Sequence, residues 1–194
     1  MRIGDYWLCR KRRPLALNSW EMTTVDIEIV SVQDLTFEER DFIGDWIGRV
    51  FGGIDSKYEW AHGEWALLIR RNGGIVSYVE VVQRRIEVDG QSVDVGGIAN
   101  VMTLEDWKRR GFASAAMRKC MGFICNKLSA DFGLLVCEAE LIPFYERLGW
   151  HVVSGPLVAD QSQGKVVLPH VTMVFACKDG EWPVGTIDLC GLPW

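Results

Sequence analysis

The stretch "WKRRGFASAAM", from Trp107 to Met117, contains the residues whose types and spacing most clearly suggest chemistry. Basic side chains lead into Gly111, and small residues follow as an amphipathic pattern begins. The first N–H groups of a helix have no intrahelical partners and the helix dipole favours negative charge, so such a stretch suits a pyrophosphate. Gly111 has no β-carbon that would block a close ligand. Taken alone, the stretch also fits a basic helix start in solvent. It lacks the GxxxxGK[ST] and GxGxxG patterns, which argues against a P-loop or a dinucleotide fold.

Upstream of this stretch we expect a strand and a helix. Apolar and polar residues alternate over Val25–Val32, which predicts the strand. Thr36 and Glu39 form a capping box at the start of an amphipathic helix. The pair Gly52-Gly53 ends that helix.

A β-meander should then lead directly into the basic stretch. The Asn72-Gly73 pair joins two strand-like runs, "WALLIRR" and "IVSYVEVVQRRIEV". Asp89-Gly90 turns into a third strand, at about Ser92–Thr103.

Downstream, the periodicity predicts alternating helices and strands. In order they are a helix over Gly111–Leu128, a buried parallel strand over Gly133–Ala139, a short helix in "IPFYERLGW", and strands near His151–Val153 and Val171–Cys177.

Length and composition favour one folded domain. The 194 residues are 48% hydrophobic, which suits a single core. We expect a basic N-terminal extension over 1–21, with Met22 as an alternative start, and one domain over 22–194 that includes a turn-rich tail, 179–194. No apolar run is long enough for a membrane span and no secretory signal is evident, so we predict a cytoplasmic protein.

Charge and cysteine content bear on the partners. The net charge of −5 argues against a nucleic-acid binder and is compatible with a cationic small-molecule substrate. None of the six cysteines shows CxxC spacing, and the chain has three histidines. We therefore expect reduced thiols in preference to a zinc site or a disulfide framework, and no metal.

Two motifs resemble those of the GCN5-related N-acetyltransferase (GNAT) superfamily. The segment Lys108-Arg109-Arg110-Gly111-Phe112-Ala113 resembles its acetyl-CoA loop, Arg/Gln-x-x-Gly-x-Gly/Ala, with Lys at the first position. "PFYERLGW" resembles its second signature, and the likeness covers about Val25 to Cys177. The aminoglycoside 2′-N-acetyltransferase group is similar in four further features: "VFGG…EWAH", the hairpin into "VVQRR", the "DW" before the loop, and a final tryptophan.

The resemblance implies an α+β fold. Its mixed, mostly antiparallel sheet of about six or seven strands is flanked by helices and splayed where acyl-CoA binds. The expected cosubstrate is acetyl-CoA. The cofactor-binding residues that the resemblance implies are Val101, Met102 and Thr103 along the pantetheine arm, and Lys108, Arg109, Arg110, Gly111, Phe112, Ala113 and Ser114 at the pyrophosphate.

The resemblance also implies a general acid, Tyr145, whose ordinary pKa of about 10 suits protonation of the leaving thiolate. The alternative is a core aromatic residue whose hydroxyl is hydrogen-bonded elsewhere. For a base, Glu138 and Glu140 lie at the end of the strand "LLVCEAE", and either could draw a proton from the amine through water. Both are equally well explained as solvated carboxylates at a strand end, and a water chain alone could serve an amine of lowered pKa.

Acceptor binding is implied for Asp55, Glu59, Trp60, Asn100 and Trp194 with its terminal carboxylate. The sequence departs from the group in this part: Ala99 replaces a glutamate, Asn100 replaces a glycine, and Leu192-Pro193 lacks the acidic residue before the tryptophan. Glu138 is a candidate to compensate. These departures leave the acetyl donor in place and bear only on the acceptor.

The resulting hypothesis is an acetyl-CoA-dependent N-acetyltransferase. The primary amine of a small cationic molecule, with aminoglycoside-like antibiotics among the candidates, attacks the thioester directly in a ternary complex. Alternatives are transfer to a peptide or protein amine, a non-catalytic acyl-CoA-binding module, and an interaction protein with a tryptophan-rich surface. Expected partners are a small-molecule amine, with no nucleic acid and no membrane; a homodimer stays open.

Overall fold

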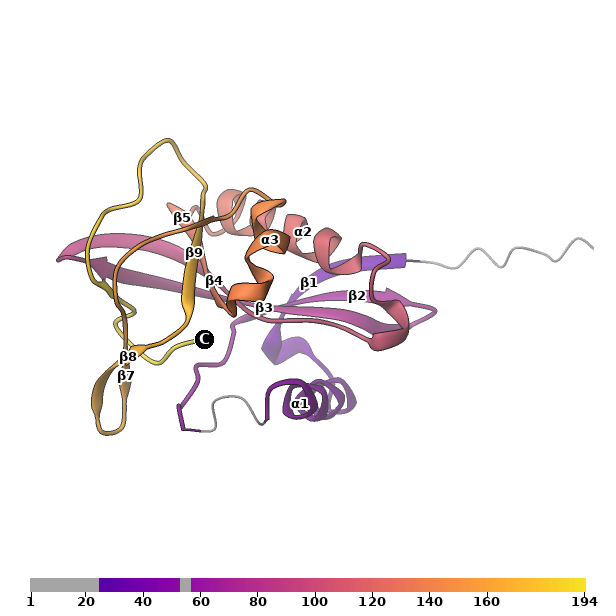
Figure 1. Ribbon diagram of the computed structural model, residues 1–194. Coiled ribbons are helices and arrows are strands. Elements are labelled where there is room, and N and C mark those ends of the chain that lie inside the picture. Colours follow the sequence, from indigo (N-terminus) through magenta and orange to yellow (C-terminus); the bar gives the residue numbers. More distant parts are fainter. Residues whose placement is uncertain (1–24, 53–56) are drawn as a thin grey trace, which may run out of the picture.

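The computed structural model describes residues 25–52 and 57–194, which form one mixed sheet flanked by helices (Figure 1). Among the described residues the strands are β1 (Val25–Ser31), β2 (Trp65–Arg71), β3 (Gly74–Val88), β4 (Gln91–Thr103), β5 (Phe132–Cys137), β6 (His151–Val152), β7 (Leu157–Gln161), β8 (Gly164–Leu168), β9 (Val171–Ala176) and β10 (Ile187–Asp188). The helices are α1 (Phe37–Phe51), α2 (Phe112–Asn126) and α3 (Ile142–Glu146), with 3-10 turns η1 (Val32–Asp34), η2 (Glu105–Trp107) and η3 (Ala139–Leu141).

The local signals in the first half of the chain predict these elements correctly. The Thr36 side chain accepts a hydrogen bond from the Glu39 amide and the Glu39 side chain accepts one from the Thr36 amide, so the predicted capping box starts α1. Asn72-Gly73 and Asp89-Gly90 all have positive φ, between 50° and 82°. Two-residue turns of this kind join antiparallel strands, and they produce the β2–β3–β4 meander.

The sheet is mostly antiparallel, with a short parallel pairing at its centre. The strand order is β6-β9-β5-β4-β3-β10-β7-β8, and β2 joins β1 to the first half of β3. β4 and β5 are parallel and pair only from Val95–Phe132 to Ile98–Leu135. The last five residues of β4, 99–103, have no register partner in β5. The predicted splay of the sheet therefore begins after Ile98.

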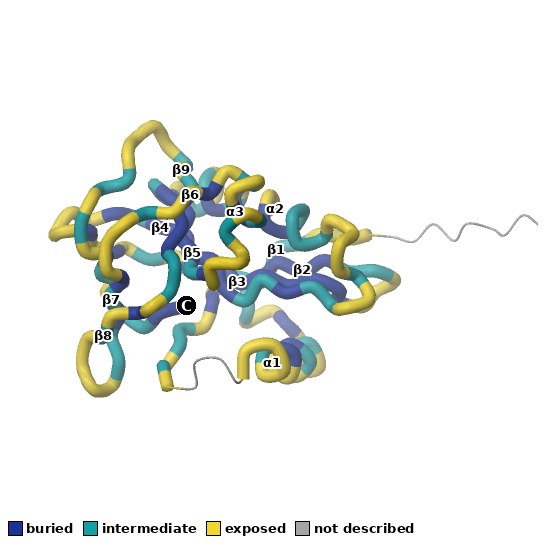
Figure 2. Tube along the Cα trace, viewed as in Figure 1, coloured by how far each residue is buried: buried dark blue, intermediate teal, exposed yellow. Residues whose placement is uncertain are grey.

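Helices cover both faces of the sheet. α2 packs on one face through residues such as Met117 and Ile124, whereas Ile43 and Trp46 of α1 pack on the other (Figures 1 and 2). The C-terminus lies on the α1 side in Figure 1. None of the helices in the described part of the chain is long and apolar enough to cross a membrane.

The second half of the chain contains three strands that the sequence does not reveal: β7, β8 and β10. The described sheet therefore has ten strands instead of six or seven. β10 is two residues long, too short to show a period of two, and lies within the predicted turn-rich tail. The β7–β8 turn, Ser162-Gln163, lacks the Asn-Gly or Asp-Gly signature of a hairpin.

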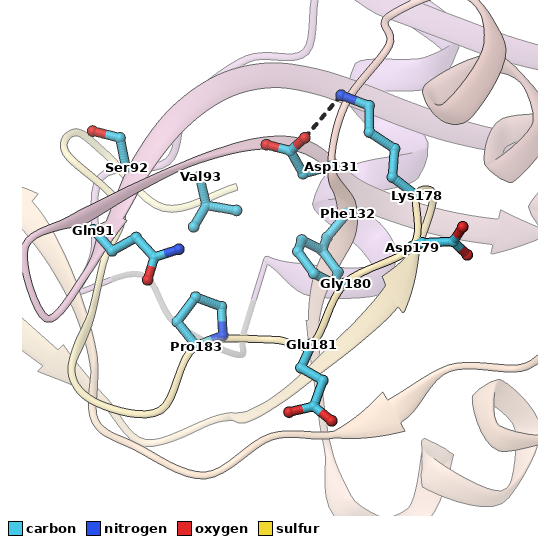
Figure 3. Close-up of a pocket in the computed structure, with 10 residues that line it drawn as sticks. All are labelled: Gln91, Ser92, Val93, Asp131, Phe132, Lys178, Asp179, Gly180, Glu181 and Pro183. Carbon is cyan, nitrogen blue, oxygen red and sulfur yellow. Dashed lines mark hydrogen bonds and ion pairs between the residues drawn. The ribbon is translucent and has the colours of Figure 1, made fainter.

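A cavity of about 210 Å³ opens beside the first residues of β4 (Figure 3). Its walls include Gln91, Phe132 and the segment 178–181 that follows β9, and the Lys178–Asp131 ion pair, 2.8 Å long, lies at its edge. None of the predicted site residues in the described part of the chain lines this cavity, and the predicted pantetheine residues Val101–Thr103 are at the opposite end of β4.

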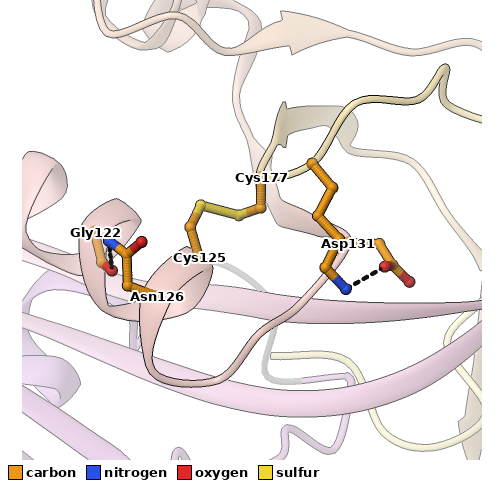
Figure 4. Close-up of a disulfide and its surroundings, with 6 residues drawn as sticks. Gly122, Cys125, Asn126, Asp131 and Cys177 are labelled. Atoms are coloured by element: carbon orange, nitrogen blue, oxygen red, sulfur yellow. Dashed lines mark hydrogen bonds and ion pairs between the residues drawn. A yellow bond between two sulfur atoms is a disulfide. The ribbon is translucent and has the colours of Figure 1, made fainter.

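The expectation that all six cysteines are reduced is wrong, because Cys125 and Cys177 form a disulfide (Figure 4). Cys125 is near the end of α2, and the chain returns from there to β5, whose first residue pairs with Ala176 of β9. This crossover brings the two α-carbons to 4.9 Å, although the residues are 52 apart in sequence. Disulfide pairing depends on such tertiary distances, so the spacing of the cysteines gave no sign of it.

Three further cysteines in the described residues are free thiols. Cys120 and Cys137 are buried, whereas Cys190 is exposed. Burial raises the pKa of the Cys137 thiol to about 11. The two buried thiols pack as small apolar side chains.

Candidate active site

The predicted phosphate loop joins β4 to α2 through two left-handed residues, Arg109 with φ 58° and Gly111 with φ 84°. Gly111 is the N-cap of α2, and the first helical bond runs from the Ala115 amide to the Gly111 carbonyl. The N–H groups of Phe112, Ala113 and Ser114 come before that bond and have no intrahelical acceptor. A β-carbon at Gly111 would meet nothing within 4 Å, so there is open space at the N-cap of α2. This arrangement fits an anionic group.

The cations of the loop differ in their availability. Lys108 is paired with Glu105 at 2.7 Å, and both side chains are exposed. The Arg110 guanidinium lies 4.9 Å from the centre of the Trp107 ring, and Arg71 at the end of β2 lies 5.2 Å from the same ring. The buried Nε of Arg71 has no hydrogen-bond partner among the described residues. Sequence reasoning missed Arg71, because only the fold brings the end of β2 to this loop.

A β-bulge interrupts β4 just beyond its last pair with β5. Ala99 pairs with Glu80 and Met102 pairs with Tyr78, so Asn100 and Val101 together oppose one residue of β3. Asn100 has a positive φ of 51°. A bulge leaves its extra residue outside the ladder and bends the strand, which frees backbone at the predicted pantetheine positions.

Glu80 lies beside this bulge and is 7% exposed. Its Oε1 accepts a 2.6 Å hydrogen bond from the Tyr78 hydroxyl, and its Oε2 accepts a 2.8 Å bond from Asn100 Nδ2. Burial raises the pKa of Tyr78 far above its ordinary value and the Glu80 charge raises it further, so the hydroxyl remains a donor. Sequence reasoning missed Glu80. The available signal was a single carboxylate within the run Ile75–Val82, which is buried throughout.

Two predicted site residues, Trp60 and Glu138, both lie close to His170, which the sequence did not indicate. The rings of Trp60 and His170 are 6.2 Å apart, and His170 Nε2 lies 4.0 Å from Glu138 Oε1. Glu138 follows β5 and its side chain is 63% exposed, whereas that of His170 is 10% exposed. His170 had no motif around it in the sequence, and its role depends on β9 lying beside β5.

The other predicted acidic side chains are those of Glu59, Glu140 and Asp55. Glu59 is exposed, and its backbone forms two hydrogen bonds with the Gln161 side chain in β7. Glu140 is also exposed, in η3. Asp55 lies outside the described residues.

Trp194 is 5% exposed and its indole covers Gly97 of β4. The Arg84 guanidinium lies 5.0 Å from the centre of the indole, and burial lowers the pKa of Arg84. The Ala61 amide donates to the Pro193 carbonyl at 2.6 Å, so the segment before β2 is joined to the C-terminal segment. Trp194 thus lies beside β4, next to the bulge.

Tyr145 is in α3 and is only 5% exposed, in contact with the rings of Phe144 and Trp150. Burial raises the pKa of Tyr145 well above its ordinary value, and the neighbouring Cys137 raises it further. The Tyr145 phenol is therefore a weaker acid than a tyrosine with the ordinary pKa of about 10. It remains protonated at neutral pH and can donate a hydrogen bond to a sulfur atom.

Comparisons with known proteins agree with this architecture. A family model described as "Acetyltransferase (GNAT) domain" matches residues 33–153. The chain is 26% identical over 144 residues to an aminoglycoside 2′-N-acetyltransferase of Mycolicibacterium fortuitum, and the match covers 73% of each protein.

Solved structures share the fold at low sequence identity. Escherichia coli ElaA superposes with a TM-score of 0.57 at 15% identity, covering 78% of this chain and 99% of the other. An acyl-CoA N-acyltransferase from Pseudomonas aeruginosa gives 0.56 at 18% identity, covering 79% and 100%. E. coli YhbS, solved in complex with CoA, gives 0.56 at 12% identity, covering 86% and 89%.

Proposed function

The chain belongs to the GNAT acetyltransferase family, and on that premise we propose that it transfers the acetyl group of acetyl-CoA to a primary amine of a small cationic molecule. Family membership makes it an acyl-CoA-dependent N-acetyltransferase. The observation that carries the proposal is the separation of β4 from β5 after Ile98 and Leu135, directly before the open N-terminus of α2. Acidic and aromatic side chains lie around the same end of the two strands.

The donor would bind along β4 and the loop that follows it. The amides of Phe112, Ala113 and Ser114 would receive the pyrophosphate, with Arg109, Arg110 and, more weakly, Lys108 as counter-charges. Arg71, whose Nε is buried beside Trp107, adds a fourth cation. The backbone of Val101, Met102 and Thr103 would pair with the pantetheine arm, which replaces β5 as their neighbour.

The acceptor would lie among Trp60, Glu138 and His170, with Glu59, Asn100 and Trp194 nearby. Carboxylates attract an ammonium, and aromatic rings bind cations over their faces. The relative from M. fortuitum is named for aminoglycosides, which are compact polyamines. An aminoglycoside-like acceptor is therefore the first class to test.

The reaction would be a direct transfer. The neutral amine attacks the thioester carbon, the C–N bond forms, and the C–S bond breaks to release the CoA thiolate. A backbone N–H of the bulge at Val101 would stabilise the oxyanion. Tyr145 would donate a hydrogen bond to the departing sulfur, and Glu138, with His170 beside it, would receive the proton lost by the nitrogen through water.

The first test is a thermal-shift titration with acetyl-CoA, followed by product mass analysis for tobramycin, kanamycin A, spermidine and a peptide with a free N-terminus. Tobramycin carries an amine at the 2′ position, where kanamycin A carries a hydroxyl, so this pair reports the site of transfer. Acetylation of tobramycin or spermidine is the expected result. Acetylation of the peptide alone would contradict the small-molecule acceptor, and absence of transfer to all four would contradict the proposal.

A further inference from the structure

Glu80 is a charged residue at the boundary between two apolar clusters. Along β3 its neighbours on the same face are Tyr78, which packs with α1, and Val82, which packs with the C-terminal segment. Its cross-strand neighbours are Ala66 on β2 and Ala99 on β4. All four neighbours are buried. A carboxylate in such a place needs a specific reason, because burial of a charge is costly.

Two hydrogen-bond donors hold the Glu80 carboxylate in position, but no basic side chain among the described residues forms an ion pair with it. Tyr78 and Asn100 each donate to one of its oxygens. None of the ion pairs formed within residues 25–52 and 57–194 involves Glu80. A buried anion of this kind would gain most from a cationic guest.

Small residues surround the Glu80 side chain. Ala66 and Ala99 flank it, and a β-carbon at Gly63 would come within 3.0 Å of the Glu80 Cβ. Gly63 belongs to the segment 57–64, which is bonded to the C-terminal segment through Ala61 and Pro193. These segments meet on the face of the sheet opposite α2, the side on which Figure 1 shows α1 and the C-terminus.

Glu80 also lies close to the place of acetyl transfer. Its cross-strand partner, Ala99, is the first residue of β4 beyond the last pair with β5. Its hydrogen-bond donor, Asn100, is a residue of the bulge. The carboxylate is therefore adjacent to the backbone that the proposed function assigns to the thioester.

We propose that Glu80 is a binding site for the ammonium group of the acceptor and the base that takes its proton, an inference that rests on the proposed function. The ammonium gives one proton to the carboxylate, and the freed lone pair forms the C–N bond as the C–S bond breaks. The CoA thiolate leaves with the electron pair of the C–S bond and takes up the second proton that the nitrogen loses as the amide forms. Tyr78 and Asn100 are assigned as positioning residues, since each donates a hydrogen bond to the carboxylate. Glu80 thus takes the proton directly in place of Glu138, and the exposed Glu138 serves a second ammonium of a polyamine.

The test replaces Glu80 by Gln, which keeps the volume and one acceptor oxygen, turns the other oxygen into an NH2 donor, and removes the charge. For whichever of the four test amines is the best acceptor, kcat/KM should fall roughly 100-fold, the usual contribution of a positioned base. Acetyl-CoA affinity should stay within about twofold of wild type, a change below 0.5 kcal/mol. Glu87→Gln is the matched control, because Glu87 is an exposed carboxylate on the same strand.

A second variant moves the carboxylate from β3 to the opposite position on β4. Glu80 and Ala99 are directly opposite in the register, and such pairs have β-carbons about 5 Å apart. The double variant Glu80→Ala/Ala99→Glu should therefore recover at least about tenfold in kcat/KM over Glu80→Ala, an effect of about 1.4 kcal/mol. A purely structural role would not be rescued in this way, because the bonds from Tyr78 and Asn100 depend on the original position.

The outcomes separate this inference from the proposed function. Unchanged kcat/KM in Glu80→Gln, in an enzyme that acetylates an amine, overturns the role of Glu80 and leaves the function standing. A parallel loss of acetyl-CoA affinity and thermal stability assigns Glu80 to the scaffold and likewise overturns it. A wild-type protein that neither binds acetyl-CoA nor acetylates any of the four amines contradicts the proposed function itself.

Discussion

The indole of Trp194 lies directly over the α-carbon of Gly97, in the space that a side chain at position 97 would occupy. Gly97→Ala should therefore displace the indole and lower the free energy of unfolding by about 1–3 kcal/mol, the usual cost of overpacking. Urea denaturation measures this. Gly48→Ala on α1, where a β-carbon meets nothing within 4 Å, should instead stabilise the protein slightly. Wild-type stability in Gly97→Ala would show that the indole is not held against the strand.

Gly111 should be required for the cosubstrate and not for folding. Asn tolerates positive φ better than most residues, so Gly111→Asn should fold but place a side chain in front of the α2 amides. We expect the dissociation constant of acetyl-CoA to rise at least about tenfold, or 1.4 kcal/mol, by calorimetry. Gly90→Asn is the control, because Gly90 has a φ of 82° and equally open space in a distant turn. Equal affinities in the two variants would argue against the phosphate loop.

Tyr145→Phe should lower turnover about tenfold or more while leaving acetyl-CoA affinity unchanged, because only the sulfur contact is lost. Since burial raises the pKa of Tyr145, this hydroxyl should cause no decline of kcat up to about pH 10. A pH–rate profile of wild type and variant checks both points. Turnover equal to wild type would leave Tyr145 as a core aromatic.

Alkaline pH should destabilise the protein through Tyr78 and Tyr145. Both have raised folded pKa values, whereas an unfolded tyrosine titrates near about pH 10. Above that pH the unfolded chain loses protons that the native state keeps, so the free energy of unfolding falls as pH rises. The stabilisation is complete below about pH 10. Denaturation curves between about pH 9 and 11 should show a smaller decline for Tyr145→Phe than for wild type.

The Cys125–Cys177 disulfide closes a loop of 52 residues, for which the chain-entropy relation gives about 4 kcal/mol. Cys125→Ser/Cys177→Ser should lose stability of this order in guanidinium denaturation. A reducing agent should destabilise the wild type and leave the double variant unaffected. If the reductant leaves the stability of the wild-type protein unchanged, the disulfide adds nothing to that stability.

The part of the fold that could be predicted is the part encoded by short-range signals. Thr36 with Glu39, Asn72-Gly73 and Gly111 each fix a backbone geometry within a few residues, and α1, the meander and the start of α2 follow from them. β10 is different, because its two residues are a strand only through their pairing with β3 and β7.

The site divides in the same way. The loop residues Lys108–Ser114 are contiguous and carry a motif, so the sequence could indicate them. Glu80, Arg71 and His170 act through neighbours on other strands, and no local pattern marks them. Even the buried run around Glu80 becomes informative only when α1 and the C-terminal segment are known to cover the same face.

The distribution of thiols decides how turnover should be assayed. A colorimetric thiol reagent would detect released coenzyme A but would also titrate the exposed Cys190. Burial raises the pKa of Cys190, with the Asp188 charge adding to the effect, so this background reaction would be slow and would drift with pH. Adding a reductant is no remedy, because it consumes the reagent and opens the disulfide. Loss of thioester absorbance, with Cys190→Ser as the reference protein, avoids both sources of error.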